Sequence, residues 1–125
     1  MPLPPLIAIV EDDDSLREAV AGLVESMGHR AMGFADAESF LDAGITPDCL
    51  ITDITLPGAS GLELKQTLDA RGRTEPVIMI TARAEAVVLD KARASGALCV
   101  LRKPFTPTTL IECLDRALSG SGHTA

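Results

Sequence analysis

Acidic side chains follow two apolar runs in this 125-residue sequence, at the places where buried strands would end. Glu11 and Asp12 follow the run 6–10, and Asp53 lies near the end of the run 49–54. A buried, unpaired carboxylate is costly, and like charges held together raise one another's pKa. A divalent cation would remove this conflict. Mg²⁺ fits best, because it takes oxygen ligands, retains water and is commonly held by one or two carboxylates and a phosphate.

A hydroxyl and an amine complete a set of groups suited to a phosphoryl group. Thr81 ends the run 77–81 and Lys103 follows the run 97–101, so both reach the same edge as the acids if these runs are parallel strands. Lys103 offers a positive charge to phosphate oxygens, and the Thr81 hydroxyl can donate to one of them. With Asp53 as the nucleophile, attack on phosphorus forms an acyl phosphate. The pattern therefore predicts Asp53 as the phosphoacceptor.

Each of these residues also has an ordinary structural interpretation. An aspartate of the run EDDD can cap the helix that follows, Thr81 can simply end a strand, and Lys103 can be a surface lysine. These interpretations do not explain why acids, a hydroxyl and an amine should meet at one edge. Neither histidine lies near the acids, since His29 starts the edge strand and His123 lies in the tail. We interpret both as solvated side chains and expect no zinc site.

The elements that place these groups follow from the apolar pattern. Four of the five runs are continuous rather than alternating, which is typical of strands covered on both faces in a parallel sheet, and the weaker second run suits an edge. The runs span 6–10, 30–34, 49–54, 77–81 and 97–101. Amphipathic helical patterns lie between them, and glycines at 28, 44, 72 and 96 end the first four. Thr106 and Pro107 open the last helix.

Alternating strands and helices predict an α/β fold. We expect a flavodoxin-like, doubly wound (βα)5 domain, a three-layer sandwich whose five-stranded parallel sheet has the order 2-1-3-4-5. The domain should span residues 1–118, and the Gly/Ser-rich tail 119–125 is either a flexible terminus or a severed linker. In such sheets ligands bind beyond the carboxyl ends of the strands, where the strand order reverses, here between the first and third strands.

Composition excludes several classes of function. Eighteen acidic residues against eleven basic ones give a net charge of −7, so we expect no direct contact with nucleic acid. Without Trp or Tyr, few residues could sandwich a flavin or a base. The start of the chain lacks the pattern of a signal peptide or a membrane span, which predicts a cytoplasmic protein. The three cysteines lie in apolar runs, and we interpret them as reduced core thiols: Cys49, Cys99 and Cys113.

Four motifs occur together in the chain: VEDDDSLR (10–17), ITDITLPGASGLEL (51–64), MITAR (79–83) and LRKPF (101–105). Their combination resembles the receiver domain of two-component response regulators, over residues 5–118. The segments CLITDITLPGASGLEL and FADAESFL are similar in sequence to the same segments of receivers that precede helix-turn-helix transcription modules. The resemblance implies a signalling domain that controls an output, here transcription through a module absent from this chain.

The resemblance also implies the chemistry of the acidic residues. Asp53 is expected to accept a phosphoryl group from the phosphohistidine of a histidine kinase or a histidine phosphotransfer protein. Asp12 is expected to ligate Mg²⁺ directly, Glu11 to assist largely through water, and the Thr55 backbone carbonyl to supply another ligand. The domain is then not an enzyme, although it promotes its own Mg²⁺-dependent phosphorylation and dephosphorylation.

By the same resemblance, Thr81 and Lys103 contact the phosphoryl oxygens, and a cis Lys103-Pro104 bond aims the lysine inward. Phosphorylation would pull Thr81 toward the phosphate and bias the surface formed by the fourth helix, the fifth strand and the fifth helix. The expected partner is a histidine kinase or a histidine phosphotransfer protein, and we expect no contact with a membrane. Whether phosphorylation also produces a homodimer is left open.

Two positions depart from the family pattern. Glu11 stands where such receivers often have Asp, and its extra methylene should change how directly it reaches the metal. Val100 stands where many receivers have Phe or Tyr, and valine has one stiff torsion and no ring to move inward. The usual coupling of threonine to an aromatic ring is therefore in doubt. Phe105 is expected to pack in the core and not to replace that ring.

Three other functions compete with this one. A Mg²⁺-dependent phosphohydrolase of the haloacid dehalogenase type also uses an aspartate nucleophile, but it needs a second aspartate where this chain has Thr55. A flavin carrier shares the fold, but EDDD has the wrong charge to bind a cofactor phosphate. A receiver-like module that is never phosphorylated is disfavoured by the complete set of acids, threonine and lysine.

Overall fold

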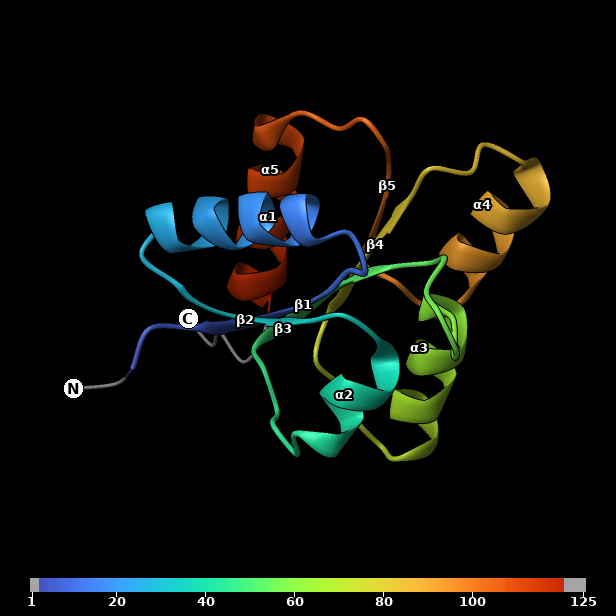
Figure 1. Ribbon diagram of the computed structural model, residues 1–125, viewed down its shortest axis with the longest axis horizontal. Helices are drawn as coiled ribbons and strands as arrows, with labels where there is room; N and C mark the ends of the chain where they lie inside the picture. The colour runs from blue at the N-terminus through green and yellow to red at the C-terminus, as the bar shows by residue number, and fades with distance from the viewer. Residues whose placement is uncertain (1–2, 121–125) are drawn as a thin grey trace.

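The computed structural model describes residues 3–120, in which strands and helices alternate along the chain (Figure 1). The elements are β1 Leu6–Val10, α1 Asp14–Ser26, β2 Arg30–Phe34, α2 Ala37–Asp42, β3 Cys49–Asp53, α3 Gly61–Ala70, β4 Val77–Thr81, α4 Ala86–Ala94, β5 Cys99–Arg102 and α5 Pro107–Gly120. Each predicted strand is present, and the first, second and fourth have the predicted limits.

The strands form one parallel sheet in the order β2-β1-β3-β4-β5, which confirms the predicted fold. Every residue of β3 and β4 is buried, as the continuous apolar runs indicated. No residue of β2 is fully buried, as expected for an edge strand. The strand order reverses between β1 and β3, so the carboxyl ends of these two strands lie side by side there.

Helices cover both faces of the sheet, with α1 and α5 on one side and α2, α3 and α4 on the other (Figure 1). Successive strand side chains point to opposite faces, so each buried strand contributes to two cores. In β1, for example, Ile7 and Ile9 pack under α1 and α5, whereas Ala8 and Val10 pack under α2 and α3. Burial on both faces therefore holds the strand ends, and the residues that follow them, in fixed positions.

Helix ends follow the expected signals. The Asp13 side chain accepts a hydrogen bond from the Leu16 backbone N–H at 2.9 Å and caps α1. Thr106 caps α5 in the same way, accepting from the Thr109 N–H at 3.2 Å. The four helix-ending glycines all have positive φ: Gly28, Gly44, Gly72 and Gly96. These caps determine where each loop at the sheet edge begins.

Three elements have limits that differ from the prediction. β3 ends at Asp53 and not at 54. β5 starts at Cys99 and not at 97, because the chain leaves α4 through Gly96 and uses two more residues to turn into the sheet. Helix α5 continues to Gly120, so the first two residues assigned to the tail are helical. The rest of the tail, 121–125, lies outside the described residues. Within residues 3–120, no helix is long and apolar enough to cross a bilayer.

All three cysteines are buried and free, as predicted. Burial raises the pKa of Cys49 and of Cys113 to about 12. These thiols therefore remain protonated at neutral pH and act as small apolar core residues.

Candidate functional site

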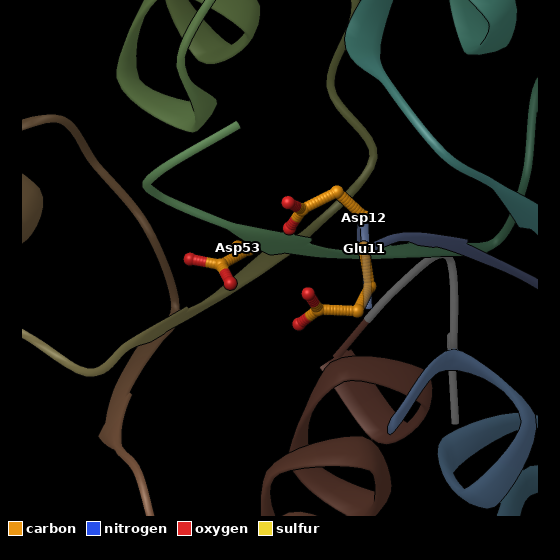
Figure 2. Close-up of side chains that lie close together, drawn as sticks. All are labelled: Glu11, Asp12 and Asp53. Carbon is orange, nitrogen blue, oxygen red and sulfur yellow. The ribbon is translucent and has the colours of Figure 1, made fainter. Parts of the chain in front are cut away.

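Three acids meet where the strand order reverses. Glu11 and Asp12 follow β1 directly, and Asp53 is the last residue of β3. One carboxylate oxygen from each lies within 4.8 Å of the other two, and Figure 2 shows the side chains gathered beyond the ends of the two strands. Glu11 and Asp53 are 3% and 5% exposed, whereas Asp12 is open to solvent. The predicted acidic cluster is therefore formed, with two of its members buried.

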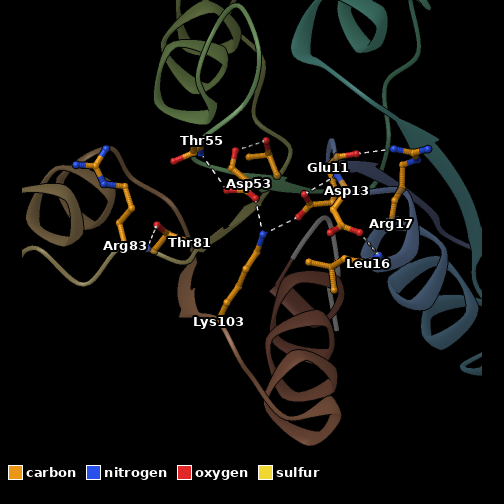
Figure 3. A network of polar contacts seen from close by, with 10 residues as sticks. Glu11, Asp13, Leu16, Arg17, Asp53, Thr55, Thr81, Arg83 and Lys103 are labelled. Carbon is orange, nitrogen blue, oxygen red and sulfur yellow. Dashed lines mark hydrogen bonds and ion pairs between the residues drawn. The ribbon is translucent and has the colours of Figure 1, made fainter.

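Lys103 reaches the cluster from the end of β5. Its Nζ atom lies 2.6 Å from Asp53 Oδ2 and 3.1 Å from Glu11 Oε1 (Figure 3). Burial alone would lower the pKa of Lys103, but the hydrogen bond that it donates to Asp53 and the negative charges of Asp53 and Glu11 outweigh burial and raise the pKa. The ammonium is therefore held charged beside the predicted phosphoacceptor. The Lys103-Pro104 peptide bond is cis, as expected.

Glu11 leaves one buried oxygen without a hydrogen-bond donor. Its Oε2 accepts from the Asp13 backbone N–H at 3.1 Å, but Oε1 makes only the ion pair with Lys103, without hydrogen-bond geometry. Burial is the largest effect on this carboxyl and raises the pKa of Glu11. Three carboxylates thus face one ammonium, and one buried oxygen is unsatisfied. This all-oxygen donor set fits a hard divalent cation such as Mg²⁺.

The loop after β3, residues 54–60, carries Thr55 beside the phosphoacceptor. The Thr55 backbone N–H donates to Asp53 Oδ1 at 3.0 Å, which fixes the carboxylate from the side opposite Lys103. At the end of the loop, Gly61 lies directly against the backbone of Asp53. Only glycine fits at this position, because a Cβ there would lie 2.2 Å from the Asp53 carbonyl oxygen. Sequence reasoning missed Gly61, although glycine as the first residue of a helix was a usable signal. The role of the Thr55 carbonyl as a ligand stays a prediction.

Thr81 lies at the same edge, but its hydroxyl is engaged elsewhere. The residue is buried, and Oγ1 accepts from the Arg83 backbone N–H at 2.9 Å (Figure 3). Among the described residues this hydroxyl makes no hydrogen bond to Asp53 or Lys103. Its own proton remains free to donate, so contact with a phosphoryl oxygen stays a prediction. The backbones are joined, since the Lys103 N–H donates to the Thr81 carbonyl at 2.8 Å.

This arrangement has a match among protein families. Residues 7–115 match the model described as the response regulator receiver domain. The chain belongs to the response regulator receiver domain family. Receiver domains of this kind act in two-component systems and switch through phosphorylation.

Several curated relatives of this receiver domain are transcriptional regulators by name. It is 37% identical to the transcriptional regulatory protein FixJ of Azorhizobium caulinodans, over 94% of this chain and 56% of FixJ. It is 34% identical to the DNA-binding transcriptional regulator NtrC of Klebsiella pneumoniae, over 89% of this chain and 24% of NtrC. The chain therefore spans about half the length of the FixJ-type relatives it matches, and less of NtrC.

Solved structures agree with the family assignment. The response regulator StyR is 31% identical with a TM-score of 0.86, covering 94% of this chain and 61% of that one. The receiver domain of a Pseudomonas aeruginosa sensor histidine kinase, solved with a magnesium ion coordinated in its active-site cleft, is 25% identical with a TM-score of 0.83, covering 93% and 98%.

Arg17 is a receiver residue at this site to which sequence reasoning assigned no role. Its guanidinium donates to the Glu11 carbonyl oxygen at 2.7 Å (Figure 3). It also donates to Asp14 Oδ1 at 2.5 Å. Its side chain crosses β2 at Gly33, where a Cβ would lie 3.0 Å from the arginine Cδ. Arg17 therefore holds the β1–α1 loop, residues 11–13, from outside. Its place within the motif VEDDDSLR was the available signal.

The remaining predicted positions lie apart from the receiver's acidic cluster. Phe105 packs against the core under α1 and α5, as expected, and Val100 packs half-buried against the core on the other face. His29 is half-buried in the turn before β2, where full solvation was expected, and it is not among the clustered ligands of the described residues. His123 lies outside the described residues.

Proposed function

We propose that Asp53 accepts a phosphoryl group, in the presence of Mg²⁺, from the phosphohistidine of a histidine kinase or a histidine phosphotransfer protein. The observation that carries this proposal is the placement of Lys103 Nζ 2.6 Å from Asp53 Oδ2, inside a cluster of three acids. This contact places a positive charge between two buried carboxylates, where it can bind the oxygens of an incoming phosphoryl group. The family match and the magnesium-bound neighbour support the same conclusion.

Glu11, Asp12, Asp53 and the Thr55 carbonyl would hold the cation. Bound Mg²⁺ supplies positive charge that neutralises the phosphoryl oxygens during transfer. A carboxylate oxygen of Asp53 attacks phosphorus, forming a P–O bond while the P–N bond of the phosphohistidine breaks and its electron pair returns to the imidazole. Lys103 then moves its contact from Asp53 to a phosphoryl oxygen, and the Thr81 hydroxyl donates to another. Water reverses the modification by hydrolysing the acyl phosphate at the same site.

The output surface is proposed to be formed by α4, β5 and α5. Thr81 ends β4, which pairs with β5, and Lys103 follows β5 directly, so both residues adjoin this surface. Val87 on α4 is 64% exposed, and Val100 offers no ring to relocate, so we propose that α4 shifts without an aromatic switch. Residues 1–118 would act as the receiver, and 119–125, whose first two residues continue α5, as a tail or linker. The output is transcription through a module outside this chain. Formation of a homodimer on phosphorylation is one way in which the receiver would control that module.

We place this exchange in the cytoplasm, where the three free thiols would stay reduced. Acetyl phosphate tests the chemistry without a partner. We expect intact-mass spectra to show one added phosphoryl group with Mg²⁺, and none with a chelator or in Asp53→Asn. Asp48→Asn, which changes an exposed aspartate before β3, is the matched control and should still be modified. Retention of the phosphoryl group by Asp53→Asn would remove Asp53 from this role.

A further inference from the structure

A carboxylate from α2 reaches the loop beside the phosphoacceptor. Glu38 is the second residue of α2, and its Oε2 accepts a hydrogen bond from the Ala59 backbone N–H at 3.1 Å, across 21 positions of sequence. We propose that Glu38 is a positioning residue, which holds the β3–α3 loop in the form that presents Thr55 to the metal. This inference rests on the proposed function, because it assigns Glu38 a part in the same site.

The loop is shaped to receive this carboxylate. Gly58 has a φ of 74°, in the left-handed region that favours glycine. A Cβ at position 58 would lie 3.0 Å and 3.1 Å from the two carboxylate oxygens of Glu38. The close approach of Glu38 to the loop therefore depends on the missing side chain at position 58 as well as on the exposed N–H at position 59.

Glu38 supplies the hydrogen bond that joins the middle of the loop to α2. At its start, the loop is tied down by the bond from the Thr55 N–H to Asp53 Oδ1. At its end, the Gly61 N–H donates to the Ile54 carbonyl at 2.8 Å, and Ser60 caps α3. Between these ties, Leu56 and Ala59 pack against the core, and the bond from the Ala59 N–H to Glu38 is the hydrogen bond that links this part of the loop to a different helix among the described residues. Its loss should let residues 55–59 move, and the Thr55 carbonyl with them.

Three substitutions separate positioning from simple charge. Glu38→Gln keeps an acceptor oxygen at the same reach and removes the charge. Glu38→Asp keeps the charge and shortens the reach by one methylene, and Glu38→Ala removes both. If Glu38 acts by position, Gln should behave like the parent and Asp like Ala. If it acts only through its negative charge near the cation, Asp should behave like the parent and Gln like Ala.

Two measurements on each variant of the 125-residue chain test this proposal. The first is amide hydrogen exchange at Ala59 in the metal-free protein, followed by NMR, where we expect Asp and Ala variants to exchange about fivefold faster. The second is Mg²⁺ affinity from amide shifts, where we expect the same two variants to bind about fivefold more weakly and Gln to stay within about twofold. Unchanged exchange in Glu38→Ala, or faster exchange with unchanged affinity, would overturn the proposal.

The two failures can be told apart. If the parent binds no Mg²⁺ and takes no phosphoryl group from acetyl phosphate, the proposed function is wrong, and the metal-positioning role of Glu38 is wrong with it. If the parent does both and the Glu38 variants show the charge pattern, the proposed function stands and only the positioning role is lost. Circular dichroism of each variant checks that the fold is retained.

Discussion

Glu11→Gln should make the metal-free domain more stable while weakening its response to Mg²⁺. Glu11 is 3% exposed, and its Oε1 has no hydrogen-bond donor. A buried polar atom left without a partner costs about 1–3 kcal/mol. The contact with Lys103 at 3.1 Å offsets part of this cost. We therefore expect the substitution to raise the free energy of unfolding by about 1 kcal/mol at neutral pH.

The pH dependence of this gain follows from the raised pKa of Glu11, of which burial is the largest cause. The folded chain holds the proton more tightly than the unfolded chain, where the carboxyl titrates near 4.5. The stability that this group contributes is therefore complete below 4.5 and is lost as pH rises through the folded pKa. Glu11→Gln lacks this loss. The difference between the two proteins should grow from near zero in acid to its full size at neutral pH.

Urea unfolding followed by circular dichroism measures the effect, since the chain has no Trp or Tyr to report by fluorescence. At a concentration ten times its dissociation constant for the parent, Mg²⁺ should raise the free energy of unfolding of the parent by about 1.4 kcal/mol. The same concentration should raise that of Glu11→Gln by less. Glu18→Gln, an exposed glutamate of α1, is the matched control and should change neither quantity. If Glu11→Gln is the less stable protein in chelator, or if the difference in stability is the same in acid and at neutral pH, burial of the charged Glu11 carboxylate does not destabilise the domain.

Three further results are expected. At about pH 8, roughly one in 10,000 of the thiol groups of Cys49 and Cys113 is ionised, because their pKa is about 12. Mass spectrometry should therefore find both cysteines unmodified by iodoacetamide until urea unfolds the chain. Rapid labelling of the folded protein would contradict their burial. Gly61→Ala should cost about 3 kcal/mol in urea unfolding because its Cβ meets a backbone oxygen at 2.2 Å, whereas Gly22→Ala, with open space around it, should be neutral or stabilising. Equal effects of the two would refute this. Arg17→Gln should weaken Mg²⁺ binding about threefold, because it frees the β1–α1 loop. Removing the positive charge of Arg17 would by itself strengthen Mg²⁺ binding. Tighter binding by the variant would therefore show that the effect of charge is the larger one.

Much of the fold was predictable because its signals are local. Continuous apolar runs indicated buried parallel strands, and the weak run 30–34 indicated the edge strand. Glycine at a helix end and Thr106 before Pro107 act through the conformation of one or two residues, so they can be read without tertiary information. The predicted limits of β5, 97–101, were wrong, because where a strand starts depends on its pairing with a neighbour.

The sequence alone also determined which groups share the site. Asp53 and Lys103 follow parallel strands, and the carboxyl ends of parallel strands meet at one edge. Only the tertiary structure decided how those groups are used: that Lys103 bonds to Asp53, that Glu11 keeps an unsatisfied oxygen, and that Glu38 holds a loop 21 residues away. The physical reason is that burial and hydrogen bonding depend on which distant segments pack together. Spacing along the chain does not encode the partner of a particular oxygen.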